Sequence, residues 1–210
     1  MVGCGRALVN ERIAIVEPES RRRLPPDIVG EVWVNGPNVA RAYWRNAEAT
    51  RSNLTAQIAG EDNAVDWLRT GDLGFLDKTG ELFITGRIKD LIIVRGINHY
   101  PQDIEHTVQG LDPAFRRHGG AAFSVCDEGG EETLVIVQEI ERTERNRVDP
   151  AEMTAVIREG VAEQHELFAR HILLIKPGAL PKTTSGKIQR SLARRLWIER
   201  RFDDLALGTV

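Results

Sequence analysis

LPKTTSGKIQR, residues 180 to 190, places Lys187 directly after Gly186 in a segment of small polar residues, just before a predicted helix. Small polar residues and glycine favour turn conformations, and glycine lets the backbone pass close to a ligand. A lysine there is a mobile positive charge that suits the charge developing on a phosphate group in a transition state. The alternative is an ordinary solvated lysine, since most loop lysines simply meet water.

The spacing in this stretch excludes a Walker-type phosphate-binding loop. That motif needs four residues between its first glycine and the Gly-Lys pair, and a serine or threonine after the lysine. Gly178 lies too far upstream of Gly186, and Ile188 occupies the position of the hydroxyl residue. No such loop precedes it in the chain, so the sequence predicts only half of a nucleotide-binding active site.

A second informative stretch runs from Leu68 to Glu105, LRTGDLGFLDKTGELFITGRIKDLIIVRGINHYPQDIE. Asp72 lies between glycines, which permit close approach, and its two oxygens could accept hydrogen bonds from both hydroxyls of a ribose. An ordinary aspartate turn is the alternative. Arg87 follows a predicted hairpin and could donate to the same sugar or pair with a surface carboxylate.

The character of the sequence changes near Gly86. Residues 1–86 are predicted to be β-rich, with short apolar or alternating runs bounded by glycine and proline. Residues 91–210 mix strands with amphipathic helices, as in a small α/β domain whose sheet is flanked by helices. Between them, a glycine followed by charged residues over 87–90 could serve as a hinge. The predicted class is therefore α+β.

Capping residues and apolar stripes predict individual elements. Four helices are predicted: 46–55 capped by Asn46, 101–109 ended by Gly110, one opened by Asp149 and Pro150, and 187–201. In the second region, strands are predicted at 90–94, 121–125, 133–138 and 172–175. A hairpin over 75–84 has a turn closed by Gly80.

Composition and charge argue against several functions. The net charge of −3 argues against bulk attraction to nucleic acid or anionic lipid, and the arginines of the last helix have few aromatic neighbours. Cys4 and Cys126 form neither a disulfide framework nor a zinc site, which fits a reducing cytoplasm. The five histidines lack metal-ligand spacing, and His99 is predicted to lie in a loop. No apolar run approaches the ~20 residues of a membrane span, and no leader is recognisable.

Four motifs in one order carry a family resemblance: GEVWVNGPNVARAYW from Gly30, RTGDLG from Arg69, GRIKDLIIVRGINHYPQDIE from Gly86, and LPKTTSGKIQR from Leu180. On these motifs the chain resembles the ANL superfamily of adenylate-forming enzymes, which includes acyl- and aryl-CoA synthetases, peptide-synthetase adenylation domains and luciferases. The resemblance implies the β-rich end of a large N-terminal domain followed by a mobile C-terminal domain. The phosphate loop and acyl pocket would lie outside this chain, so the 210 residues alone are expected to be inactive.

The resemblance also implies roles for individual residues. Asp72 and Arg87 would bind the ribose of the adenylate, and Lys89 would lie at the hinge. Lys187 would bridge the substrate carboxylate and the α-phosphate of ATP during adenylation. The loop near Gly96 would line the tunnel for the acceptor's pantetheine. Mg²⁺ is expected to accompany ATP, although no metal ligand is recognisable in the sequence.

Within the superfamily the chain is most similar to fatty acyl-AMP ligases, on NHYPQDIE after the hinge strand and on Trp67-Leu68, where many relatives have a tyrosine. Such ligases form acyl-AMP and pass the acyl group to an acyl carrier protein in polyketide or lipid biosynthesis. Ile97 departs from the basic residue expected after Arg95-Gly96. The alternatives are a fatty acyl-CoA ligase and, in another class, a non-catalytic module that docks a carrier protein.

Overall fold

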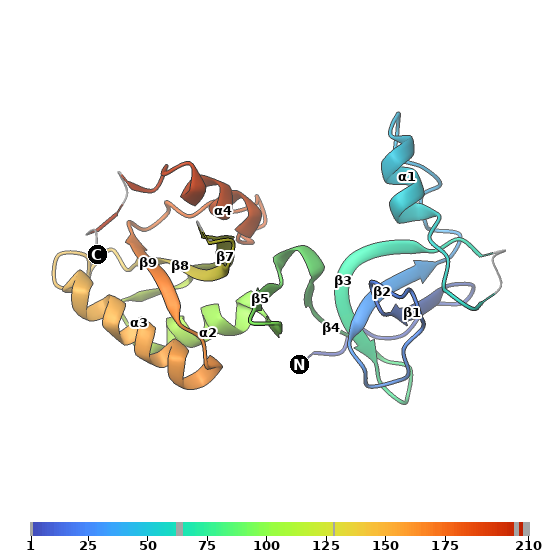
Figure 1. Ribbon diagram of the computed structural model, residues 1–210, viewed down its shortest axis with the longest axis horizontal. Coiled ribbons are helices and arrows are strands. Elements are labelled where there is room, and N and C mark those ends of the chain that lie inside the picture. Colours follow the sequence, from blue (N-terminus) through green and yellow to red (C-terminus); the bar gives the residue numbers. More distant parts are fainter. Residues whose placement is uncertain (1, 62–64, 128, 204–205, 208–210) are drawn as a thin grey trace. The chain divides into compact units, whose positions relative to one another are not determined.

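The structure of the chain is a computed structural model that describes residues 2–61, 65–127, 129–203 and 206–207. The chain divides into two compact units, Met1–Lys89 and Asp90–Val210. Across these described ranges, the first unit combines a sheet with one α-helix and the second combines sheets with three, so the predicted α+β class is confirmed (Figure 1). The division falls inside the range 87–90 that was predicted as a hinge; movement there remains a proposal.

The first unit is a four-stranded antiparallel sheet in chain order. Its strands are β1 (Arg12–Val16), β2 (Gly30–Asn35), β3 (Leu68–Leu76) and β4 (Leu82–Arg87). The β3–β4 hairpin turns where predicted, and Gly80 has the positive φ of +82° that glycine adopts without strain. The core of this unit gathers around the fully buried Trp33.

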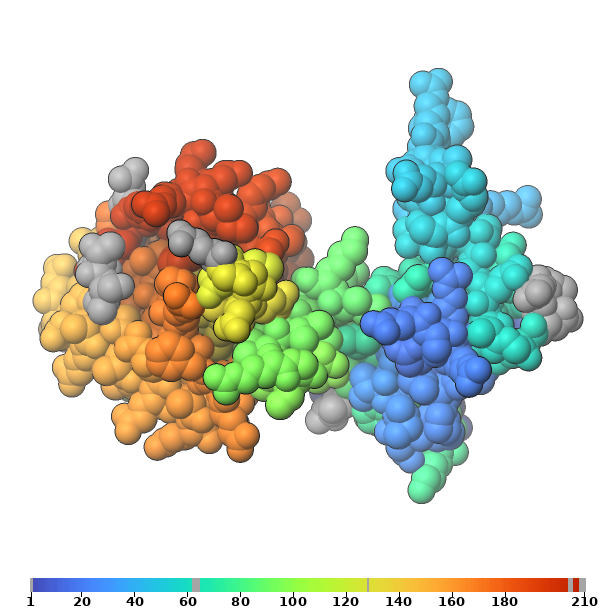
Figure 2. All heavy atoms as spheres, viewed as in Figure 1, coloured from blue at the N-terminus to red at the C-terminus, as the bar shows by residue number. Residues whose placement is uncertain are grey.

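One helix in the first unit, α1 (Ala47–Leu54), begins where its capping residue predicted. The Oδ1 of Asn46 accepts a hydrogen bond from the Ala49 N–H at 2.9 Å, which satisfies one of the free donors at the helix start. Figure 2 shows α1 and the chain around it as a narrow column that projects from the first unit. The helix therefore contributes little to the core, and Leu54 is its one buried residue.

The second unit is built on a three-stranded mixed sheet in the order β7-β8-β9. Its strands are β7 (Phe115–Cys126), β8 (Glu132–Ile140) and β9 (Ala169–Ile175). The helices of this unit are α2 (Pro101–Leu111), α3 (Pro150–His165) and α4 (Arg190–Ile198). Before them come a 3₁₀ turn (Ile88–Asp90) that spans the boundary and a ribbon of β5 (Ile92–Val94) and β6 (Ile97–His99). β8 pairs antiparallel with β7 and parallel with β9, and α3 supplies the crossover that a parallel pair requires.

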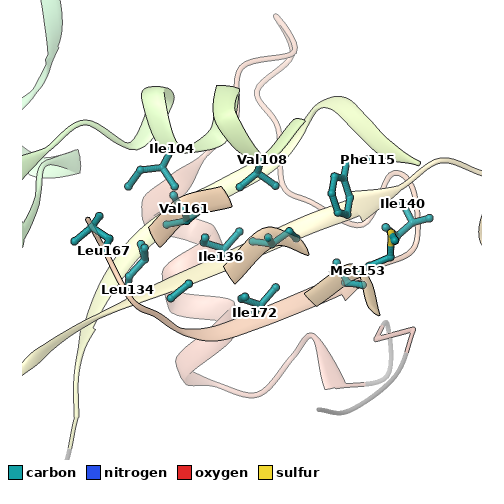
Figure 3. Close-up of a cluster of buried hydrophobic side chains, with 14 of the residues drawn as sticks. Ile104, Val108, Phe115, Leu134, Ile136, Ile140, Met153, Val161, Leu167 and Ile172 are labelled. Atoms are coloured by element: carbon teal, nitrogen blue, oxygen red, sulfur yellow. The ribbon is translucent and has the colours of Figure 1, made fainter. Parts of the chain in front are cut away.

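The sheet of the second unit buries both faces. Alternate residues of β8 point to opposite faces, so Leu134 and Ile136 enter one core while Val135 and Val137 enter the other. Figure 3 shows the first core, where side chains of α2 and α3 meet those of the strands. The second core lies under α4 and includes the buried Phe202. Burial on both faces explains why β8 reads as a continuous apolar run.

α3 begins where its capping residue and its proline predict. Its first residue is Pro150, and the Oδ1 of Asp149 accepts from the Ala151 N–H at 3.0 Å.

Among the residues that the structure describes, no helix combines the length and apolarity needed to cross a bilayer.

Several predicted boundaries were wrong. α2 continues through Gly110 and ends at Leu111. The next residue, Asp112, has the extended backbone (φ −149°, ψ 141°) that the following Pro113 favours. The last helix is only Arg190–Ile198, because the backbone at Ile188 pairs with Lys182 instead.

The strands of the second region also differ from their predicted ranges. β7 starts at Phe115, six residues before the predicted 121, because its charged start hides the alternation. β8 and β9 likewise extend beyond the predicted 133–138 and 172–175. β5 covers only Ile92–Val94 of the predicted 90–94. His99 is not in a loop but ends β6.

Candidate functional site

Asp72 and Arg87 are direct neighbours across β3 and β4 in the first unit. The Nε of Arg87 donates to the Oδ1 of Asp72 at 2.7 Å. The arginine is exposed and the aspartate is half-buried, so the pair lies within reach of a ligand. A carboxylate acceptor beside a guanidinium donor matches the mixed hydrogen bonding that sugar hydroxyls need.

A buried carboxylate fixes the part of β3 that carries Asp72. Glu31 on β2 is 2% exposed, and its Oε2 accepts from the Arg69 Nε at 2.9 Å while its Oε1 accepts from the Gly71 N–H at 3.2 Å. The Thr70 hydroxyl accepts from the Asp72 N–H at 3.1 Å and donates to a backbone carbonyl of β2 at 2.7 Å. Gly71 has φ +72°, which favours glycine. Sequence reasoning missed Glu31 because Arg69 and Gly71, the partners that tie it to β3, lie 38 and 40 residues away in the chain.

Lys187 lies on a tight, exposed turn of the second unit. The Thr183 N–H donates to the Lys187 carbonyl at 2.8 Å, and the Lys187 N–H returns a bond to the Thr183 hydroxyl at 3.0 Å. The Gly186 N–H donates to the Thr183 carbonyl at 2.9 Å, with Gly186 at φ +83°. Within the described ranges, the Lys187 ammonium has no ion-pair or hydrogen-bond partner. The turn therefore presents an uncompensated positive charge to solvent.

Gly96 forms the tip of the β5–β6 ribbon. Arg95 (φ 52°) and Gly96 (φ 75°) are both left-handed, as a two-residue hairpin turn requires. The ribbon lies beside an open cavity of about 1150 Å³ in the second unit, lined by Arg95, Ile97 and His99 and by the end of α3. Gly96 does not itself line this cavity.

Two histidines at this cavity are held in their neutral form. Burial lowers the pKa of His99 below its ordinary value, and the nearby His165 adds to this effect. Burial also lowers the pKa of His165, whose Nε2 lies 2.9 Å from the Thr107 hydroxyl. Neither ring therefore supplies a charge for anion binding at neutral pH.

Lys89 is exposed and is the last residue of the first unit, within the 3₁₀ turn that spans the boundary. Across the part of the chain that the structure describes, no three histidine, cysteine or acidic side chains gather as a metal site would require. Asp72 and Arg87 offer an acceptor beside a donor, and Lys187 offers a positive charge, but the described residues offer no ligand set for Mg²⁺.

Comparison with known proteins identifies the family of the chain. The family model described as "Disco-interacting protein 2-like, AMP domain" matches residues 89–206. The chain is 48% identical over 203 residues to the medium-chain-fatty-acid–[acyl-carrier-protein] ligase JamA of Moorena producens, covering 97% of this chain and 34% of that protein. It is 40% identical over 187 residues to the long-chain-fatty-acid–AMP ligase FadD26 of Mycobacterium tuberculosis, covering 85% and 31%. The chain thus spans about a third of the length of these relatives.

Solved structures show the same fold. The chain superposes with a TM-score of 0.78 and 28% identity on McyG A-PCP complexed with phenylalanyl-adenylate, covering 97% of this chain and 30% of that one. For the fatty acyl-adenylate ligases of E. coli and L. pneumophila the TM-score is 0.76 at 28% identity, with 97% and 34% covered. The predicted similarity to adenylate-forming enzymes is confirmed, and the family match extends over more than half of the chain. The chain belongs to the Disco-interacting protein 2-like AMP-domain family.

Proposed function

We propose that this chain supplies the ribose-binding pair and the catalytic lysine of an enzyme that activates a fatty acid as acyl-AMP and passes the acyl group to an acyl carrier protein. The observation that carries the proposal is the exposed Lys187, held on an ordered turn and without an ion-pair or hydrogen-bond partner for its ammonium among the described residues. The names of the relatives support the fatty acid substrate and the carrier acceptor.

The chemistry of these side chains suits a two-step reaction. A carboxylate oxygen of the fatty acid attacks the α-phosphorus of ATP, forming a C–O–P bond and releasing pyrophosphate. The Lys187 ammonium stabilises the negative charge on the carboxylate and the α-phosphate as they approach. The Asp72 carboxylate accepts hydrogen bonds from the ribose hydroxyls. Arg87 orients the Asp72 carboxylate through the 2.7 Å hydrogen bond that it donates. The deprotonated thiol of the acceptor then attacks the acyl carbon, and AMP leaves.

The acceptor separates this proposal from a fatty acyl-CoA ligase. Coenzyme A carries three phosphate groups that cationic side chains would bind. At the tip of the β5–β6 ribbon, Arg95 is followed closely by Ile97, which is 61% exposed and uncharged. An apolar residue at this tip favours an acceptor without charged nucleotide phosphates there. The pantetheine arm of a carrier protein is such an acceptor, because contacts with the carrier protein take the place of the nucleotide of coenzyme A.

A chimera tests the function. This chain replaces the matching third of the Moorena producens ligase, and pyrophosphate release is measured with ATP, Mg²⁺ and medium-chain fatty acids. We expect acyl-AMP formation by the chimera, and acyl transfer to a carrier protein in preference to coenzyme A. A folded but inactive chimera would favour the non-catalytic docking module, and a preference for coenzyme A would favour the fatty acyl-CoA ligase.

The 210-residue chain alone is the matched control for the chimera. We expect its pyrophosphate release to stay at background. Contacts from Asp72 and Lys187 are too few to overcome the ~4–15 kcal/mol that association costs before any contact forms. Robust activity of the chain alone would contradict the proposal that the remaining site residues lie elsewhere.

Asp72→Ala in the chimera should raise the KM for ATP by about 10- to 100-fold, because hydrogen bonds to a charged group contribute roughly 1.5–3 kcal/mol. Steady-state kinetics at saturating fatty acid measure this effect. Asp27→Asn is the control, since the Asp27 carboxylate makes a long, exposed contact of 3.9 Å with Lys78. An unchanged KM in a folded Asp72 variant would remove this residue from the site.

A further inference from the structure

A buried ion pair lies at the end of the Lys187 segment. Arg190 is the first residue of α4, three positions after Lys187. Its Nε and Nη2 donate to the two carboxylate oxygens of Glu105 on α2, each at 2.7 Å. Glu105 is only 7% exposed, and its Oε1 also accepts from the Ala122 N–H of β7 at 3.0 Å. The pair thus joins the start of α4 to both α2 and the sheet.

The same arginine reaches the boundary between the units. Its Nη1 donates to the Oδ2 of Asp90 at 3.3 Å, and Asp90 is the first residue of the second unit. Two carboxylates therefore surround one guanidinium. Only arginine supplies a planar fork of donors for such an arrangement, whereas lysine is a point charge.

The other end of the segment is held by a second buried carboxylate. Glu139 on β8 is fully buried, and its Oε1 accepts from the Leu180 N–H at 2.9 Å. Its Oε2 lies 3.8 Å from the Lys182 Nζ and 3.2 Å from Arg116. The segment 180–190 is thus fixed at both ends to buried carboxylates of the second unit. The turn with Lys187 lies between these two anchors and is exposed to solvent.

Removing one charged partner of the Glu105–Arg190 ion pair is expected to be destabilising. Burial raises the pKa of Glu105, while Arg190 and the Ala122 N–H oppose that shift. The hydrogen bonds that Arg190 donates to the Glu105 carboxylate raise the pKa of Arg190. Removing the charge of Glu105 leaves a largely buried guanidinium with Asp90 as its remaining carboxylate, an arrangement that favours movement of the α4 start.

We propose that Glu105 and Arg190 are positioning residues for Lys187: their bidentate pair fixes the start of α4, and with it the point from which the lysine reaches the reacting phosphate. The inference rests on the proposed function. A displacement of about 1 Å at a catalytic group can cost on the order of 10²-fold in rate, so an anchor three residues away affects catalysis without touching substrate.

Backbone dynamics of the 210-residue chain test the positioning without any activity. In Glu105→Gln, we expect the ¹⁵N order parameters of Gly186 and Lys187 to fall from about 0.85, typical of rigid backbone, toward 0.6 or below. Amides in the middle of β8 should keep their wild-type values. Asp127→Asn, which breaks an exposed 2.8 Å ion pair with Arg170 in the same unit, is the control and should leave the turn rigid.

Kinetics in the active chimera provide the second test. We expect Glu105→Gln and Arg190→Lys each to lower kcat for adenylation by about 10- to 100-fold, with the KM for ATP within about twofold of wild type. Thioester formation from supplied acyl-AMP should stay near wild type. Arg190→Lys keeps the charge but loses the fork, so wild-type activity in that variant would overturn the role of the bidentate pair.

The remaining outcomes separate the two proposals. An inactive wild-type chimera sinks the proposed function, yet the order parameters still decide whether the pair holds the turn. A rigid turn in Glu105→Gln overturns the positioning role. A lowered Tm with equal losses in both half-reactions assigns the pair to stability alone, which also overturns it.

Discussion

Replacing Lys187 with alanine in the chimera lowers the rate of adenylation by about 10²–10³-fold, the typical cost of losing one group aimed at developing charge. The effect is large because the Lys187 ammonium has no partner within the described ranges, so its whole charge is available to the substrate. Single-turnover formation of acyl-AMP measures the first half-reaction. Thioester formation from supplied acyl-AMP measures the second, which we expect to survive.

The matched control for this prediction is Lys176→Ala, another exposed lysine of the second unit, which should leave both rates unchanged. Equal losses in the two half-reactions of Lys187→Ala would contradict its assignment to adenylation. Loss of secondary structure in the variant would point instead to a role in folding.

The second large effect concerns stability. Ile136 is 1% exposed on the central strand β8 and belongs to the core that α2 and α3 cover (Figure 3). Ile136→Ala should lower the free energy of unfolding of the second unit by about 2–5 kcal/mol, through lost burial and the cavity left behind. Urea unfolding followed by the amide signals of β8 measures this change. Ile93→Ala, at a half-exposed position of β5, is the control and should cost far less.

The same experiment tests whether the two cores are independent. The core around Trp33 lies entirely within the first unit. Unfolding followed by amides of β2 should therefore keep its midpoint in Ile136→Ala. A shift of both transitions by the same amount would show that the units unfold together.

Elements with local signals could be predicted from the sequence alone. Asn46 and Asp149 cap the helices that follow them, because each side chain bonds an amide only two or three residues ahead. Gly80 closes its hairpin for an equally local reason, the positive φ of the turn. Lys187 was likewise placed on a turn because its glycine and hydroxyl neighbours act within a few residues.

The supports of the site could not be predicted in the same way. The Glu31–Arg69, Glu139–Leu180 and Glu105–Arg190 contacts join residues 38, 41 and 85 positions apart. A single glutamate beside apolar residues is normally expected to face solvent, since burial of an unpaired carboxylate is costly. Only the fold brings each partner into place.

The sheet of the second unit has a consequence for aggregation of the protein when it unfolds. β8 contains the run Leu134–Val137, which is apolar on both faces, rich in β-branched residues and free of proline. Short segments of this composition stack readily between chains when they are exposed. In the folded protein β7 and β9 cover both edges of β8, so the run is hidden. We therefore expect opening of this unit to promote aggregation, and charged residues placed beside the run to protect the protein without touching the site.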